Sequence, residues 1–248
     1  MKDIELLGGK QWQPLQPFGI SHPFFAIDKS TVINTWIALG ALFILIILAR
    51  FFLRRRLSTG RYIVLSYVRS FIDLVSQSLG YFSYGHSVFV VALFSFIILC
   101  NCIAILPWVE EPTKELNTTF ALGLIAFFYI QIYAIRAHGF FGYLKEYFTP
   151  FFFMFPLHVI GKLSTIISMS FRLFGNIFGS ATIMHIYHAL LAGSPWFQIA
   201  GLLSGLNILM VSFFIIFEGC LQAFVFTMLT VTYLAIALAH DDQIGEMT

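Results

Sequence analysis

Two apolar segments near the C-terminus, residues 151–191 and 197–239, most constrain what this chain can form. Each holds about forty residues, and a helix of that length runs about 60 Å, about twice the thickness of the hydrocarbon core of a membrane. Neither segment contains an internal proline or a cluster of polar turn residues beyond its first few positions. We therefore predict one long, tilted helix for each segment, rather than two spans with a turn between them, and a hairpin joined at residues 192–195.

Three shorter apolar segments predict further membrane-spanning helices at residues 31–53, 87–106 and 120–135. About twenty apolar residues are enough to cross a membrane as a helix. Residues 60–84 mix charged side chains with aromatic and aliphatic ones and are too polar for the centre of a bilayer, so we expect an interfacial helix there. The stretch 138–150 carries glycines and charges and is predicted to be a loop.

The composition agrees with a chain that lies mostly in lipid. Hydrophobic residues make up 59% of the 248 residues and charged residues only 10%, whereas an average soluble protein is about a quarter charged. This excludes a cytosolic enzyme, a nucleic-acid binder and a disordered scaffold. We expect an all-α integral membrane protein with an exposed N-terminal arm at residues 1–30 and a single polytopic membrane domain at residues 31–248. The three cysteines lie in apolar runs, so neither a disulfide framework nor a zinc site is expected.

Lysine and arginine residues set the expected orientation in the membrane. The positive-inside rule assigns the cluster from Arg50 to Arg69 to the cytoplasm. That orientation places the N-terminal arm and the loop at residues 107–117 outside, residues 136–145 inside, and the turn of the C-terminal hairpin outside.

Charged residues are almost absent from the two long segments. Between Tyr147 and Ala239 only Lys162, Arg172 and Glu218 are charged. Lys162 lies near the start of its segment, where a long side chain can reach water. Arg172 lies in the middle, where its permanent charge costs about 3 kcal/mol or more. An arginine at that depth is a candidate functional residue by default.

Small and polar residues share the helical face of Arg172: Ser168, Gly175, Asn176 and Gly179. The bare glycine backbone on this face suggests that another element passes close to the arginine. On the second long segment Glu218 and Gln222 form an i, i+4 pair, again polar on an apolar helix. Each long helix is therefore predicted to carry polar groups at membrane depth.

Two runs within these segments resemble subunit a of F-type ATP synthases. Residues 170–179 read SFRLFGNIFG, which is highly specific for that subunit, and residues 221–234 read LQAFVFTMLTVTYL. Weaker agreement covers residues 28–36, 94–107 and 115–119. The resemblance implies a stator whose two long helices wrap a rotating ring of c subunits. It also implies two aqueous half-channels, one from each side of the membrane, which end near the arginine without meeting.

The resemblance implies roles for five residues that match family positions one by one. Arg172 corresponds to the essential arginine that faces the ring carboxylate, Asn176 to a channel-lining asparagine, and Gln222 to a glutamine opposite the arginine. Ser168 corresponds to a serine of the cytoplasmic half-channel, and Glu115 occupies the place of an acidic residue at the outer entrance. Interhelical hydrogen bonding alone for Asn176 and Gln222, and an ordinary solvated charge for Glu115, stay open as alternatives.

The sequence departs from the family pattern at two positions. Many relatives carry a carboxylate nine residues after the arginine and a histidine seven residues before the glutamine, where this chain has Ala181 and Ile215. His185 and Glu218 stand nearby. We hypothesise that His185 lines the outer half-channel and that Glu218 takes part in ion transfer, because either side chain is costly to leave in lipid.

Counting residues from the hairpin turn argues against direct pairing of His185 and Glu218. The two side chains are expected at depths about 20 Å apart, which places Glu218 near the level of Arg172. His158 and Lys162 stand where relatives often have carboxylates, so the cytoplasmic half-channel is expected to have altered electrostatics.

The partners implied by the resemblance are the c-subunit ring, the peripheral-stalk b subunits, the remaining ATP synthase subunits and membrane lipid, with no nucleic acid. No catalytic site, cofactor or metal is expected, and the sequence contains no phosphate-binding glycine loop. The coupling ion, H⁺ or Na⁺, stays open because the ring supplies the carboxylate that binds it. A bacterial plasma membrane is the favoured location, with the mitochondrial inner membrane as the alternative.

Two other classes of membrane protein compete with this interpretation. A membrane metalloenzyme would need repeated histidine clusters, whereas the seven histidines here are scattered apart from His185 and His188. A secondary transporter or ion channel would explain Arg172 and Glu218. Such proteins usually show internal repeats or broken helices, which we do not find in the sequence.

Overall fold

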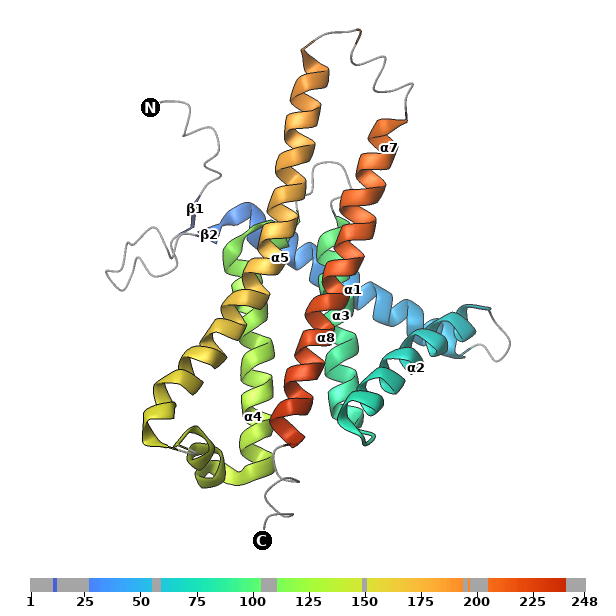
Figure 1. Cartoon of the computed structure of the whole chain (residues 1–248). Coiled ribbons are helices and arrows are strands. Elements are labelled where there is room, and N and C mark those ends of the chain that lie inside the picture. Colours follow the sequence, from blue (N-terminus) through green and yellow to red (C-terminus); the bar gives the residue numbers. More distant parts are fainter. Residues whose placement is uncertain are drawn as a thin grey trace.

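The computed structural model describes residues 11–12, 27–54, 59–103, 111–148, 151–193, 196 and 205–239 of the chain (Figure 1). Most of the expected N-terminal arm lies outside these residues. The described part is almost entirely helical, apart from an antiparallel pair of short strands, β1 (Gln11–Trp12) and β2 (Ile27–Asp28). Five of its helices are long and apolar enough to cross a membrane. The predicted fold class, an all-α multi-pass membrane protein, is confirmed.

The first three helices are α1 (Lys29–Arg54), α2 (Thr59–Leu79) and α3 (Tyr84–Cys102). Among the described side chains of α1 only Asn34 and Ala38 are buried, so nearly all of this helix faces outward. α2 is not among the helices apolar enough to span a membrane. It ends at Gly80, whose φ of 75° provides the left-handed C-cap that glycine adopts at little cost.

Helix α4 (Leu116–Phe148) shows that the expected loop at residues 138–150 is wrong. The helix follows a 3-10 turn, η5 (Pro112–Lys114), and continues to Phe148 with one break at Gly139, where φ is 71°. Glycine reaches this backbone conformation readily, so the chain changes direction there and resumes as helix, as the lower end of α4 shows (Figure 1). The prediction failed because glycines and charges are equally compatible with a kinked helix end.

The two long C-terminal segments each form one continuous helix within the described residues. α5 (Phe155–Ala192) follows the short 3-10 turn η6 (Phe152–Met154) and spans 38 residues. The opposite helix consists of α7 (Leu206–Val211), the π-helical segment η7 (Ser212–Glu218) and α8 (Gly219–Leu238). It begins later than expected, after Gly205 with its φ of 67°. Residues 197–204 of the predicted helix lie outside the described residues.

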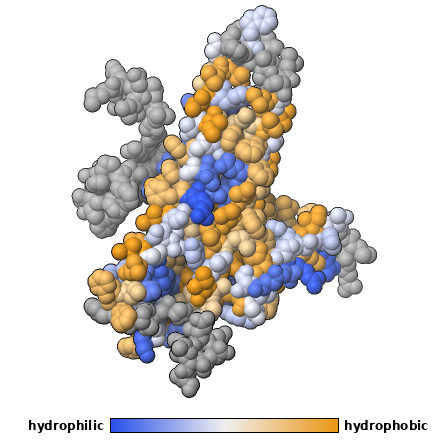
Figure 2. Space-filling model, in the orientation of Figure 1, coloured by the Kyte–Doolittle hydropathy of each residue, from blue (hydrophilic) through white to orange (hydrophobic). Residues whose placement is uncertain are grey.

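The core lies between α3, α4, α5 and α8. Its buried residues are Leu93, Ile97, Leu122, Ala126, Met169, Leu173, Ile177, Ala223 and Phe226. α5 packs mainly on α4, while α8 packs mainly on α3 and α4. Many large apolar side chains elsewhere are exposed, as contact with lipid requires (Figure 2). This packing leaves one long face of α5 uncovered by the rest of the chain.

Candidate functional site

Arg172 lies on the uncovered face of α5, near the middle of the helix. The side chains of Ser168 and Asn176 are exposed beside it, as is Gly175, while Gly179 is half-buried. The guanidinium makes no hydrogen bond or ion pair with another described residue. In the space-filling view a hydrophilic patch interrupts the apolar surface over α5 and α8 (Figure 2). The polar face predicted from helical spacing therefore points away from the chain's own core.

Gln222 holds α8 against α5 at the level of the arginine. Its Nε2 donates a hydrogen bond of 2.9 Å to the backbone carbonyl oxygen of Arg172, and the side chain is only 2% exposed. The structure thus brings Gln222 to Arg172 through the backbone and leaves the guanidinium available. Asn176, by contrast, makes no side-chain hydrogen bond with another described residue.

A cavity of about 270 Å³ lies between α5 and η7, on the side of Arg172 that faces the hairpin turn. Its polar lining consists of Asn101, Glu111, Ser180, His185, His188 and Glu218. The cavity has room for about nine water molecules at about 30 Å³ each. Ala181 and Ile215, where the chain lacks the ionisable pair expected from the family, line the same cavity. His185 and Glu218 line the cavity about one helical turn from these two positions.

Ser180 and Glu218 form the polar contact between the two helices at this cavity. The Ser180 hydroxyl lies 2.6 Å from Glu218 Oε2 and 2.7 Å from the backbone carbonyl oxygen of Asn176. Glu218 is the last residue of the π-helix η7. A π-helical turn changes the register of the side chains that follow, and such turns are frequent at functional sites. Here the changed register directs Glu218 toward α5.

The cavity also shows that the expected depth difference between His185 and Glu218 is wrong, because both residues line it. The expectation counted both helices from the hairpin turn, whereas the second helix begins only at Leu206. Glu218 therefore lies level with Ser180. About 12 Å of helix separate it from Arg172. The residue of α8 at the depth of Arg172 is Gln222.

Asn101 fixes α3, α8 and η5 at the edge of the cavity. Its Nδ2 donates to the backbone carbonyl of Gly219 at 3.0 Å, and its Oδ1 accepts from the Thr113 hydroxyl at 2.9 Å. A Cβ on Gly219 would lie 3.0 Å from that of Asn101, so this close approach needs glycine. These bonds place Glu111 in the cavity lining. Glu115, expected at the outer entrance, is half-buried at the start of α4 and does not line the cavity.

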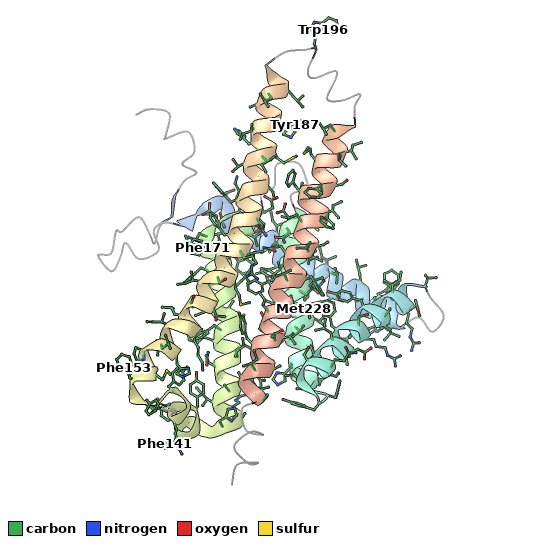
Figure 3. The ribbon with its side chains drawn as sticks, viewed as in Figure 1. Phe141, Phe153, Phe171, Tyr187, Trp196 and Met228 are labelled. Carbon is green, nitrogen blue, oxygen red and sulfur yellow. The ribbon has the colours of Figure 1, made fainter. Side chains whose placement is uncertain are left out.

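Lys162 lies between aromatic rings near the other end of α5. Its Nζ is 4.6 Å from the ring centroid of Tyr143 and 4.3 Å from that of Tyr147, and it donates a 3.3 Å hydrogen bond to the Tyr143 hydroxyl. Cation–π contacts hold this partly exposed side chain against the kinked end of α4, and its reach to water stays a prediction. The ring of His158 lies 6.3 Å from that of Tyr147. Phe141 and Phe153 mark the same end of the molecule in Figure 3.

Sequence reasoning missed Ser180 and Glu111 as cavity residues and Tyr143 as a partner of Lys162. Ser180 follows Arg172 by about two helical turns, and this spacing was the only available signal. Nothing in the sequence connected it to Glu218, because the start of the second long helix was misjudged. Glu111 has no sequence signal beyond its place in the loop between two predicted spans.

A charged side chain held at membrane depth, with a polar cavity on one side of it, is typical of membrane proteins that move ions or polar substrates. Within the described residues no group of three or more His, Cys, Asp and Glu side chains is arranged to hold a metal ion. The fold and the site therefore define a multi-pass membrane protein with a polar cavity between its long helices.

Comparisons with known proteins narrow this class to one family. The family model described as ATP synthase A chain matches residues 32–235. The chain is 34% identical over 210 residues to ATP synthase subunit a of Moorella thermoacetica, which covers 83% of this chain and 89% of that protein. It is 33% identical over 230 residues to ATP synthase subunit a 1 of Prosthecochloris aestuarii, covering 87% and 92%. The chain belongs to the ATP synthase A chain family.

Proposed function

We propose that this chain is the stator subunit that carries ions through two offset half-channels to and from the c-subunit ring of an F-type ATP synthase. As a member of the ATP synthase A chain family, it is a component of the membrane sector and not a catalytic subunit. It is an integral membrane protein. Its proposed location is a bacterial plasma membrane, where the relatives reported above would place it, and its further proposed partners are the peripheral-stalk b subunits.

The observation that carries this proposal is the uncovered face of α5 around Arg172. A Cβ added to Gly175 or Gly179 would meet nothing within 4 Å, so no described part of this chain fills the space above those glycines. An arginine exposed to lipid at this depth is strongly unfavourable. A partner that brings a carboxylate into the same space satisfies both the charge and the shape of the face, and a ring with one carboxylate per subunit is such a partner.

The cavity beside Glu218 supports an outer half-channel. It lies on the side of Arg172 toward the hairpin turn and includes the Ser180–Glu218 contact, about 12 Å of helix from Arg172. Ser168 lies one turn from Arg172 in the opposite direction and belongs, in this proposal, to the inner half-channel. The arginine then separates two paths that meet only through the ring.

Electrostatics explains how this arrangement drives rotation. An ion from one half-channel neutralises a ring carboxylate, which can then move into lipid, and the carboxylate releases its ion into the other half-channel after nearly a full turn. The permanent charge of Arg172 favours the ionised carboxylate and blocks direct leakage. A membrane potential supplies about 2.3 kcal/mol per charge per 100 mV, so several ions must pass for each ATP.

The test is ATP-driven ion uptake into vesicles that contain the assembled complex with Arg172→Ala. We expect coupled uptake to be lost, because no fixed charge then separates the half-channels. Arg69→Ala, which removes an exposed arginine from α2, is the matched control and should retain uptake. Coupled uptake by the Arg172→Ala complex would contradict the proposal. Running each assay with and without Na⁺ identifies the coupling ion.

A secondary transporter or ion channel is the alternative function, and the family match over residues 32–235 does not favour it. Purification discriminates between the two. A stator subunit co-purifies with a ring of small two-helix subunits, whereas a transporter retains activity as an isolated chain.

A further inference from the structure

We propose that Ser180 is a positioning residue whose single hydroxyl hydrogen follows the charge of Glu218, so that Glu218 can gain and lose a proton without leaving a polar group unpaired. This inference rests on the proposed ion path through the outer cavity. The resemblance implies no role for Ser180. The inference also explains how Glu218 can transfer protons although it does not stand at the family's usual position.

The geometry gives the hydroxyl two acceptors and only one hydrogen. Ser180 Oγ lies 2.6 Å from Glu218 Oε2 and 2.7 Å from the carbonyl oxygen of Asn176, and both distances suit an O–H···O hydrogen bond. A serine hydroxyl can donate one hydrogen and accept through its lone pairs. The two contacts therefore represent two alternative donor arrangements of the same side chain.

The charge of Glu218 selects between these arrangements. When the carboxylate is ionised, the hydroxyl donates to Oε2, and a hydrogen bond to a charged acceptor is stronger than one to a neutral acceptor. When the carboxyl is protonated, its own O–H donates to Ser180 Oγ, and the serine hydrogen turns to the carbonyl of Asn176. In each state the two side chains stay hydrogen-bonded to each other, so neither leaves an unpaired polar group between the helices.

The proton balance is simple. A hydronium ion in the cavity gives its proton to the Glu218 carboxylate and leaves a water molecule, and release to water is the reverse. Transfer onward to a ring carboxylate leaves Glu218 ionised and the ring carboxyl neutral. Ser180 keeps its own proton throughout and only rotates about its Cβ–Oγ bond.

Ser180 differs from the other hydroxyl side chains of the long helices by its second acceptor. Thr182 on the same helix makes the ordinary bond to the carbonyl four residues earlier, at 2.8 Å to Phe178, as do Thr165 and Thr232. Among the described residues only Ser180 combines such a bond with a carboxylate. Thr182 does not line the cavity and is therefore the matched control.

Several other charged and titratable groups face this contact. α5 contributes His185 and His188, and the segment before η5 contributes Glu111. Arg172, on the same helix, lies about 12 Å of helix away. On the α3 side Cys102 lies against Cys220, next to the Asn101 bond to Gly219. A pH profile that responds to Ser180 must therefore be compared with that of a variant that leaves all of these groups in place, as Thr182→Val does.

The experiment measures passive proton flux through the assembled membrane sector in vesicles, as a function of pH on the outer side, for Ser180→Ala, Ser180→Thr and Thr182→Val. We expect flux through Ser180→Ala to fall about tenfold, the effect of losing one hydrogen bond to a charged acceptor. The dependence of the flux on outer pH should also differ from that of the parent, because the ionised carboxylate loses its donor. Ser180→Thr keeps the hydroxyl and should stay within about twofold of the parent.

A double-variant comparison separates positioning from general damage. In a Glu218→Gln background, Ser180→Ala should cause little further loss, because no carboxylate charge remains for the hydroxyl to follow. The inference is overturned if Ser180→Ala shows the same flux and the same pH profile as Thr182→Val. It is also overturned if Ser180→Ala lowers flux in the Glu218→Gln background by the same factor as in the parent. Neither result would affect the stator proposal, which fails only if Arg172→Ala retains coupled uptake.

Discussion

Arg172 can separate two half-channels only if its charge is not neutralised by its own chain. The structure meets this condition, since Gln222 bonds to the backbone carbonyl of Arg172 and not to its guanidinium. Glu218, the one carboxylate on the hairpin helices, is held by Ser180 at a different level and forms no ion pair with the arginine. A carboxylate bonded directly to Arg172 would compete with the ring for the same charge.

Replacement of Glu218 by glutamine tests its part in ion transfer at the residue scale. Glutamine keeps the size and the hydrogen-bonding ability of the side chain but cannot take up a proton. We expect ATP-driven uptake by the Glu218→Gln complex to fall at least about a hundredfold, the low end of what a positioned proton-transfer group contributes. Glu115→Gln, outside the cavity, should have a smaller effect. Unchanged uptake by Glu218→Gln would remove this residue from the path.

At the scale of elements, two glycines distinguish the inner and outer surfaces of the hairpin. A Cβ on Gly123 of α4 would lie 2.3 Å from the Ser170 hydroxyl oxygen and 3.4 Å from a methyl carbon of Ile166, both on α5. On α5 itself, a Cβ on Gly175 would meet nothing within 4 Å. The first glycine allows two helices of this chain to pack closely, and the second leaves space for a partner.

Valine at each position should therefore cause different defects. Gly123→Val overpacks the α4–α5 contact and should destabilise the purified chain by about 1–3 kcal/mol. Gly175→Val should leave the thermal unfolding of the isolated chain near that of the parent but reduce recovery of the chain with the ring. Unfolding in detergent and co-purification of the complex measure the two effects. Normal assembly and uptake with Gly175→Val would show that nothing passes closely over this face.

The helices of this molecule could be predicted from the sequence where a long apolar run marks them. The continuous helix α5 follows from its length and lack of internal proline, and the shared face of Ser168 and Arg172 follows from helical spacing. The kink at Gly139 and the late start after Gly205 depend on single glycines with positive φ. A glycine in a sequence permits that conformation but does not require it, so neither position was predictable.

The same limit explains the errors at the site. Which residues of two antiparallel helices lie at the same depth depends on where each helix begins. If one helix begins nine residues later than expected, every facing pair of residues is misplaced by about 13 Å. The cost of polar side chains in lipid points to Arg172 and Glu218 from the sequence alone, but the contact between Ser180 and Glu218 needed the structure. The π-helical register that directs Glu218 toward α5 has no clear sequence signal.

At the scale of the whole molecule, the cavity makes the long hairpin asymmetric. Toward the hairpin turn α5 and the α7–α8 helix run side by side, and farther from it they diverge, with α4 between them and α3 beside α8 (Figure 1). The cavity lies between Arg172 and the hairpin turn, whereas the other end of α5 is filled by the aromatic contacts of Lys162. An ion entering from the turn side therefore meets Glu218 before it reaches the level of the arginine.

This asymmetry predicts which positions are reachable from each side of the membrane. In a chain whose three cysteines, Cys100, Cys102 and Cys220, are replaced by alanine, we introduce His185→Cys or Ser168→Cys. His185→Cys lines the cavity and should react with a small charged thiol reagent added outside. Ser168→Cys, on the other side of Arg172, should react only from the cytoplasmic side, because the arginine and the packed α5–α8 contact at Gln222 close the path between them.

Phe171→Cys is the control for this labelling experiment, because Phe171 is exposed on α5 beside the arginine but does not line the cavity (Figure 3). It should resist a charged reagent from both sides, since a thiol in lipid is not ionised and the reagent does not enter lipid. Modification of either test cysteine from both sides would mean one continuous aqueous path. Such a path would carry ions past Arg172 without turning the ring, so the potential would dissipate and the stator function would be lost.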